Sequence, residues 1–233
     1  MADVTSQVSA SLRALTREFD IIAHNLANVS TSGYKRRCSS FSSMLDDQQN
    51  AAASALDFSQ GNLVETGRTL DVALYGKGFF VIETPDGPLY TRHGVFRANQ
   101  NGQIVDSEGR AVAGAFGPLA VPAGIDVSQI TVGQTGQINA GGGSIGQFRI
   151  VDFAGKEDQL EAAGFCCYRA PQDVPPKDVE EVVVKQGYQE ASNVQIIDEV
   201  VSMIMVSRMY ESNMKLVNTK KDATNSVMGV AMG

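Results

Sequence analysis

Residues 8–29 read VSASLRALTREFDIIAHNLANV, and the spacing of their apolar side chains decides the fold at this end of the chain. Successive apolar positions are separated by four, three, four, three, four and three residues, which is the seam of a coiled coil. Because so narrow a stripe cannot be hidden from water by one isolated helix, the helix needs a partner. The seam consists of Val8, Leu12, Leu15, Phe19, Ile22, Leu26 and Val29.

A second stripe with the same spacing lies near the other end of the chain. We expect its helix to start after Ser192, because Ser192 and Gln195 fit a capping box. Between Val200 and Val206, apolar residues that include Ile204 point in nearly every direction, which favours contact with more than one neighbouring helix. The stripe consists of Ile196, Val200, Met203, Ser207, Tyr210, Met214 and Val217.

Between the two helical ends, the apolar pattern changes to a period of two from Leu63 onward, which is typical of strands. Three dipeptides that favour hairpin turns, at residues 86–87, 101–102 and 108–109, each end in glycine and lie between apolar runs. Two of the expected strands are 146–153 and 164–168. The predicted fold class is α+β, with N- and C-terminal helices that pair as a coiled coil and a β-rich, antiparallel middle domain.

The same patterns suggest a division of the chain. We expect an N-terminal helix in residues 1–34, an extended linker or arm in 35–62, a β-rich outer domain in 63–189, and a C-terminal helix in 190–233. The linker assignment depends on its high content of Ser, Gln, Ala and Asp.

Composition argues against several classes of function. The formal net charge is −7 and basic residues are scattered, so no nucleic-acid partner is expected. The most apolar stretch, Val200–Val206, is too short to span a bilayer, so no membrane insertion is expected. No charged segment followed by an apolar one opens the chain, so no cleaved secretory signal is expected either.

No cofactor, metal or catalytic site is predicted. Gly76-Lys77-Gly78 could suggest a phosphate-binding loop, but a strand follows it where a helix N-terminus would be required. His24 and His93 fall in different predicted layers, so neither a metal site nor a reactive pair with Cys38 is expected. Cys38 and the vicinal cysteines at 166–167 are expected to be partly buried thiols.

Four sequence blocks, in order, carry a resemblance to one protein family. The first is NLANVSTSGYK (25–35), and the second comprises GNL (61–63), TG (66–67), LDVAL (70–74) and GKGFF (76–80). The third comprises YTRHGVF (90–96) and NGQIV (101–105), and the fourth comprises QGY (186–188), EASNV (190–194) and MYE (209–211). Together they resemble the bacterial flagellar rod and hook proteins, the proximal rod most closely because of GPLAVP (117–122), with the distal rod second.

This resemblance implies a non-enzymatic subunit of the rod that connects the flagellar motor to the hook. The terminal helices would form an inner tube, and Asn25, Asn28 and Gly33 would set the turn that leaves it. The implied partners are copies of the chain, neighbouring rod proteins and the flagellum-specific type III export apparatus. The implied location is the periplasmic part of the basal body.

A rival hypothesis comes from a different class of protein. The chain could be a secreted β-rich binding module or a cell-wall-cutting enzyme that uses its helices for oligomerisation. The enzyme hypothesis requires a clustered acid pair, or a nucleophile beside a base, and the sequence indicates neither. Assembly is therefore the preferred hypothesis.

Overall fold

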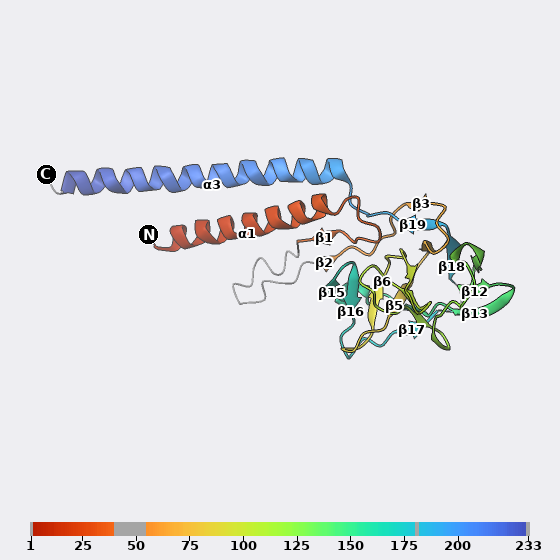
Figure 1. Ribbon diagram of the computed structural model, residues 1–233. Coiled ribbons are helices and arrows are strands. Elements are labelled where there is room, and N and C mark those ends of the chain that lie inside the picture. The colour runs from red at the N-terminus through yellow and green to blue at the C-terminus, as the bar shows by residue number, and fades with distance from the viewer. Residues whose placement is uncertain (1, 40–54, 180–181, 232–233) are drawn as a thin grey trace. The chain divides into compact units, whose positions relative to one another are not determined.

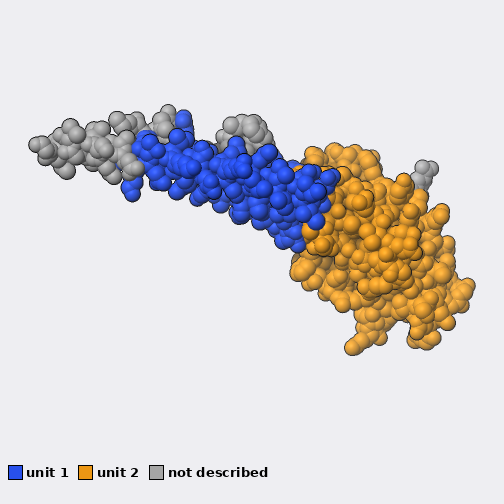
Figure 2. All heavy atoms as spheres, turned by 90° about the horizontal axis from the view of Figure 1, so that it is seen from above, with its two compact units in different colours: residues 1–27, 37–55, 194–233 blue, residues 28–36, 56–193 orange. Residues whose placement is uncertain are grey.

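The computed structural model describes residues 2–39, 55–179 and 182–231, and the chain forms two compact units (Figure 2). Unit 1 contains residues 1–27, 37–55 and 194–233, and unit 2 contains residues 28–36 and 56–193. The middle of the predicted linker, residues 40–54, lies outside the described residues.

Unit 1 is dominated by two helices, α1 (Ala2–Ala27) and α3 (Ile196–Ala231), which lie side by side and antiparallel (Figure 1). The Asn213 side-chain amide donates a hydrogen bond to Ser11 Oγ at 3.0 Å, which joins the two helices. The predicted pairing of the terminal helices is confirmed. Among the described residues, no helix combines the length and the apolar content that a membrane crossing requires.

The start of α3 differs from the prediction. The helix begins at Ile196, so Ser192 is not its N-cap and the predicted capping box is wrong. The reason is tertiary: Ala191 N–H donates to Asn62 O at 2.8 Å, and Asn193 Nδ2 donates to Asp57 O at 2.8 Å. These bonds hold the segment before Ile196 against residues 57–62 of unit 2.

Unit 2 is built on a six-stranded antiparallel sheet in the order β15-β16-β6-β5-β14-β17. Its strands are β5 (Phe79–Ile82), β6 (Leu89–Thr91), β14 (Ile150–Asp152), β15 (Glu161–Gly164), β16 (Cys167–Arg169) and β17 (Lys177–Asp178). A three-stranded sheet consists of β11 (Ile130–Val132), β12 (Gln137–Ala140) and β13 (Gly143–Gln147).

Short pairs of strands complete the β structure. They are β1 (Arg37–Cys38) with β2 (Ala55–Leu56), β3 (Leu63–Glu65) with β19 (Tyr188–Glu190), β4 (Val72–Tyr75) with β18 (Val183–Gln186), β7 (Arg97–Ala98) with β8 (Ile104–Val105), and β9 (Ala113–Gly114) with β10 (Gly117–Pro118). Two 3₁₀ turns, Val127–Gln129 and Glu157–Gln159, lie in the connections.

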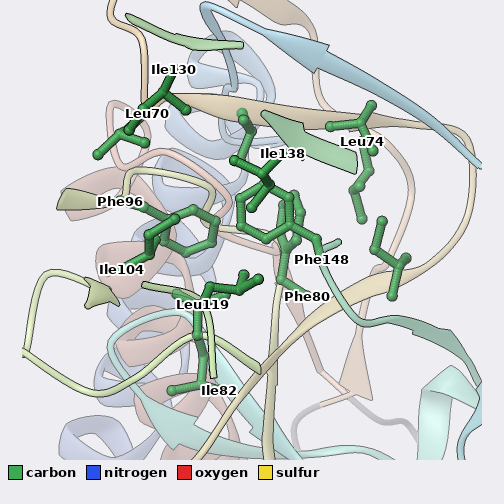
Figure 3. Packing of buried hydrophobic residues seen from close by; sticks show 14 of the residues in the cluster. Leu70, Leu74, Phe80, Ile82, Phe96, Ile104, Leu119, Ile130, Ile138 and Phe148 are labelled. Atoms are coloured by element: carbon green, nitrogen blue, oxygen red, sulfur yellow. The ribbon is translucent and has the colours of Figure 1, made fainter. Parts of the chain in front are cut away.

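Strand β5 is buried on both faces, which explains its unbroken apolar sequence. Phe80 and Ile82 point into the larger core, where Phe80 contacts the rings of Phe96 and Phe148 edge-on (Figure 3). Phe79, on the other face of the sheet, packs into a second core with aromatic residues of the neighbouring strands. The sheet is therefore the middle layer of unit 2.

The three predicted hairpin turns are confirmed, because Gly87, Gly102 and Gly109 all have positive φ between paired segments. Two strand predictions are wrong in part. Residues 164–168 are not one strand, because Phe165 and Cys166, at φ 49° and 55°, form a turn between β15 and β16. Residues 146–153 are interrupted between β13 and β14. An apolar run alone does not distinguish a strand from a tight turn.

Candidate assembly interface

The face of α3 that meets α1 is set by residues seven positions apart. Glu199 and Val206 are buried, and Asn213, which contacts α1, follows at the same spacing. The predicted stripe instead placed Val200 and Ser207 at the corresponding positions. Val200 remains 42% exposed in the single chain, so within the chain the helix pairs one residue away from the predicted register.

The opposite side of α3 is apolar in its first turns. We call this surface the apolar back of α3; its side chains are between 42% and 78% exposed. After residue 207 the same side also carries Arg208, Glu211 and Lys215, so the continuous apolar surface ends near Met205, and Met209 and Leu216 follow as separate exposed apolar residues. The apolar back consists of Ile196, Ile197, Val200, Val201, Ile204 and Met205.

The size of this surface predicts how it is used. Burying the exposed half of one such side chain contributes on the order of 1 kcal/mol, so the six together contribute roughly 6 kcal/mol. Association alone costs about 4 to 15 kcal/mol in lost translational and rotational freedom. One contact of this size is therefore marginal, whereas the same contact repeated in an array can be stable.

The other predicted interface residues differ in how far they are exposed. Ile22 is buried on α1, whereas Phe19 on the same helix is 40% exposed. On α3, Tyr210 and Met214 are both partly exposed. The remaining apolar residues of the predicted set are half-buried, namely Val8, Leu12, Leu15 and Leu26 on α1 and Val217 on α3.

The residues after α1 form a defined turn. The Asn25 side chain is buried and makes two hydrogen bonds to the backbone of Arg37, one to its N–H and one to its carbonyl, both at 2.9 Å. Within unit 2, Asn28 Oδ1 accepts a hydrogen bond from Thr31 Oγ1 at 3.2 Å. Gly33 has φ +67°, and a Cβ there would lie 2.5 Å from the backbone nitrogen of His93. A side chain at Gly33 would therefore be strained and would clash.

A buried ionic cluster lies next to this turn in unit 2. The Lys35 ammonium donates to Glu190 Oε1 at 2.7 Å and to Ser59 O at 2.6 Å. The Arg92 guanidinium lies 3.5 Å from Glu190 Oε2, and the Gly61 N–H donates to Glu190 Oε1 at 3.0 Å. All three charged side chains are at most 5% exposed. One carboxylate thus pairs with two buried cations.

Burial dominates the electrostatics of this cluster. Loss of solvation lowers the pKa of the Lys35 ammonium, and Glu190 opposes that shift. Burial likewise lowers the pKa of Arg92, again against the effect of Glu190. The Arg92 guanidinium also lies 5.4 Å from the centre of the Phe79 ring and donates to Gly76 O at 2.6 Å. These contacts fix the orientation of Arg92.

A chain of polar side chains continues from the cluster. Ser32 Oγ donates to Gln189 Oε1 at 2.6 Å, and Gln189 Nε2 donates to Asp71 Oδ2 at 2.6 Å. Thr66 Oγ1 donates to the same Asp71 oxygen at 2.7 Å. Asp71 is fully buried. The polar residues of all four sequence blocks therefore converge on one place.

Sequence reasoning missed this convergence. Lys35, Arg92 and Glu190 all lie inside the blocks that carried the resemblance, but they were not singled out as site residues. The available signal was a charged residue next to buried aromatic or β-branched neighbours, as in the stretch from Tyr90 to Phe96. Such a signal does not identify the partner, because Lys35 and Glu190 are 155 positions apart.

The structure also shows where the histidines and cysteines lie. His24 lies in unit 1 and His93 in unit 2. Among the described residues, no group of three histidine, cysteine or acidic side chains comes together as metal ligands. The thiols of Cys38 and Cys166 are partly buried and that of Cys167 is buried, and burial raises the pKa of Cys166 to about 11. Cys166 is thus a poor nucleophile at neutral pH.

Comparison with known proteins identifies relatives along nearly the whole chain. Residues 7–35 match the family described as flagella basal body rod protein, residues 73–140 match the D1 domain of the flagellar hook protein FlgE/F/G, and residues 185–228 match the C-terminal part of the flagellar basal body rod FlgEFG protein.

Individual relatives agree with these families. The chain is 32% identical to the flagellar basal-body rod protein FlgG of Agrobacterium fabrum over 94% of this chain and 95% of the relative. It is 31% identical to FlgF of Caulobacter vibrioides over 92% and 91% of the two chains. It is 29% identical to FlgG of Bacillus subtilis over 95% and 96%.

Proposed function

The chain belongs to the flagellar basal-body rod protein family and is a structural rod subunit; from this premise we propose that it builds the axial tube of the rod through its terminal helices. The apolar back of α3 carries this proposal. It would pack on helices of neighbouring subunits, and torque would pass through many such contacts acting in parallel. Subunits related by a rotation and a rise make contacts that do not close, which generates a filament.

The finer parts of the proposal concern position and partners. We place the chain in the proximal rod, in the periplasmic part of the basal body, with copies of itself and neighbouring rod proteins as partners. We propose export by the flagellar type III apparatus, and no enzymatic activity. Support comes from GPLAVP at residues 117–122 and from relatives that are named as rod proteins over more than nine-tenths of the chain.

One pair of variants tests the role of the apolar back. Ile204→Asp places a charge on the exposed apolar side of α3, and Asn218→Asp places the same charge at an exposed polar position of the same helix. We expect Ile204→Asp to abolish swimming and incorporation into basal bodies while the purified chain keeps its melting temperature. Asn218→Asp should swim normally. Normal swimming by Ile204→Asp would refute the proposed interface.

A further inference from the structure

The six-stranded sheet of unit 2 ends in two strands that pair on one side only within the described residues. β15 forms one edge, and all four of its residues, Glu161 to Gly164, are exposed. β17 forms the other edge, and both Lys177 and Asp178 are exposed. An edge strand presents a row of backbone N–H and C=O groups that another strand can bind.

Strand β15 carries little of the protection that edge strands usually have. Glu161 is its single charged residue, and two alanines and a glycine follow it. The register shift between Ala162 and Gly164 makes one end irregular, but the pairs of Glu161 with Arg169 and of Ala162 with Tyr168 are regular. The outer side of β15 can therefore accept a partner strand at its regular end.

The turn that ends β15 adds an exposed aromatic ring. Phe165 and Cys166 both have positive φ, a conformation that is strained for side chains other than glycine or asparagine. Thr91 Oγ1 donates a hydrogen bond to Cys166 O at 2.7 Å, which helps to hold the turn. Phe165 is 69% exposed as a result. Large aromatic residues are enriched at the centres of protein interfaces.

Strand direction allows a second copy of this chain to be the partner. Every neighbouring pair in the sheet is antiparallel, and the number of strands is even, so β15 and β17 of one chain point in opposite directions. A copy moved along the sheet by a shift and a rotation therefore brings its β15 next to β17 in antiparallel orientation. Glu161 on one edge and Lys177 on the other have opposite charges, whereas Asp178, beside Lys177, is paired with Arg149 of its own chain at 3.2 Å.

We propose that β15 of one copy pairs with β17 of the next copy, so that the sheets of neighbouring outer domains form a continuous ladder. This pairing rests on the proposed function, because it requires copies to stand side by side in a rod. It adds a contact through the β domain to the contacts of the terminal helices. Both edges of each subunit are used, which gives the head-to-tail contact of an open assembly.

A charge exchange tests the pairing in living cells. Lys177→Glu faces Glu161 of the next copy with a like charge, and we expect it to lower the amount of the chain in purified basal bodies at least fivefold. Glu161→Lys should do the same, and the double variant Glu161→Lys/Lys177→Glu should recover to within twofold of wild type. Glu108→Lys, in an exposed hairpin turn that belongs to neither edge strand, is the matched control and should be incorporated normally.

Two further measurements make each outcome decisive. Within the chain Glu161 lies opposite Arg169 and Lys177 lies opposite Asp152, so each single variant places like charges across two strands, and the melting temperature of each purified variant must be compared with wild type. If one of the two single variants melts early, the other carries the test. Normal incorporation of Lys177→Glu, or no recovery in a stable double variant, would overturn the pairing. Absence of the wild-type chain from basal bodies would instead overturn the proposed function.

Discussion

Replacing Glu190 by glutamine should destabilise unit 2 strongly. The side chain keeps its size, but the two buried cations, Lys35 and Arg92, lose the carboxylate that they share. Breaking a buried ion pair by removing one partner costs about 3 to 5 kcal/mol. Because the amide oxygen of glutamine can still accept the Lys35 hydrogen bond, we expect the lower end, about 3 kcal/mol of unfolding free energy.

The assay can report on unit 2 selectively. The chain has no tryptophan and six tyrosines, of which Tyr210 alone lies in unit 1. Urea unfolding of the full chain at pH 7, followed by the tyrosine signal, therefore measures mainly unit 2. Glu65→Gln is the matched control: Glu65 is exposed and accepts a hydrogen bond from the Tyr188 hydroxyl at 3.3 Å. Its effect should stay within about 0.5 kcal/mol.

A double variant separates the ion pair from other effects of the substitution. Lys35→Met removes one cation together with its need for a carboxylate, so Lys35→Met/Glu190→Gln should lose less stability than the two single losses combined. We expect a coupling free energy of about 1 kcal/mol or more. A loss below about 1 kcal/mol for Glu190→Gln at an unchanged denaturant slope, without coupling, would refute the assigned role of the cluster.

Two further predictions concern pH and the turn after β15. Burial lowers the pKa of His93 below its ordinary 6.5, against the fields of Asp106 and Asp71, so the unfolded state binds more protons below that pH. Stability should therefore fall as the pH drops from 7 to 5, and His93→Gln should flatten this dependence; parallel curves for the two proteins would contradict it. Cys166→Gly should raise the unfolding free energy by on the order of 0.5 to 1 kcal/mol by relieving a positive φ, and an unchanged or lower melting temperature would refute the strain.

Local signals in the sequence predicted the elements that depend on local chemistry. The glycine of each hairpin dipeptide, such as Gly87, has the positive φ that its turn requires. The apolar run of β5 is a strand because both of its faces are buried. The same reasoning failed at residues 164–168, where Thr91, more than seventy positions away, holds Cys166 in a turn. A tertiary hydrogen bond of this kind leaves no local pattern.

The sequence indicated which helix carries apolar residues on several sides, but not which of those sides meets α1. The apolar residues near the start of α3 indicated a helix with several neighbours, and the structure leaves its apolar back exposed. They could not show which side meets α1, because nearly every direction is apolar between Val200 and Val206. Packing decides this: Glu199 and Val206 are buried, whereas Val200 is not. The assembly role of the predicted residues stays a prediction.

The order of the ionic cluster along the chain connects stability to assembly. Unit 2 is discontinuous in sequence, and its cluster joins Lys35 to Glu190 across almost the whole domain. A buried ammonium is unfavourable until its carboxylate arrives, and closing so long a loop is slow. Unit 2 therefore cannot be completed before the segment around Glu190 is available. The apolar back begins at Ile196, six positions after Glu190 in sequence. In a chain delivered from its N-terminus, Glu190, which completes the cluster, and the apolar back therefore become available almost together. This order limits how long an incomplete subunit exposes the apolar back, which favours assembly over aggregation.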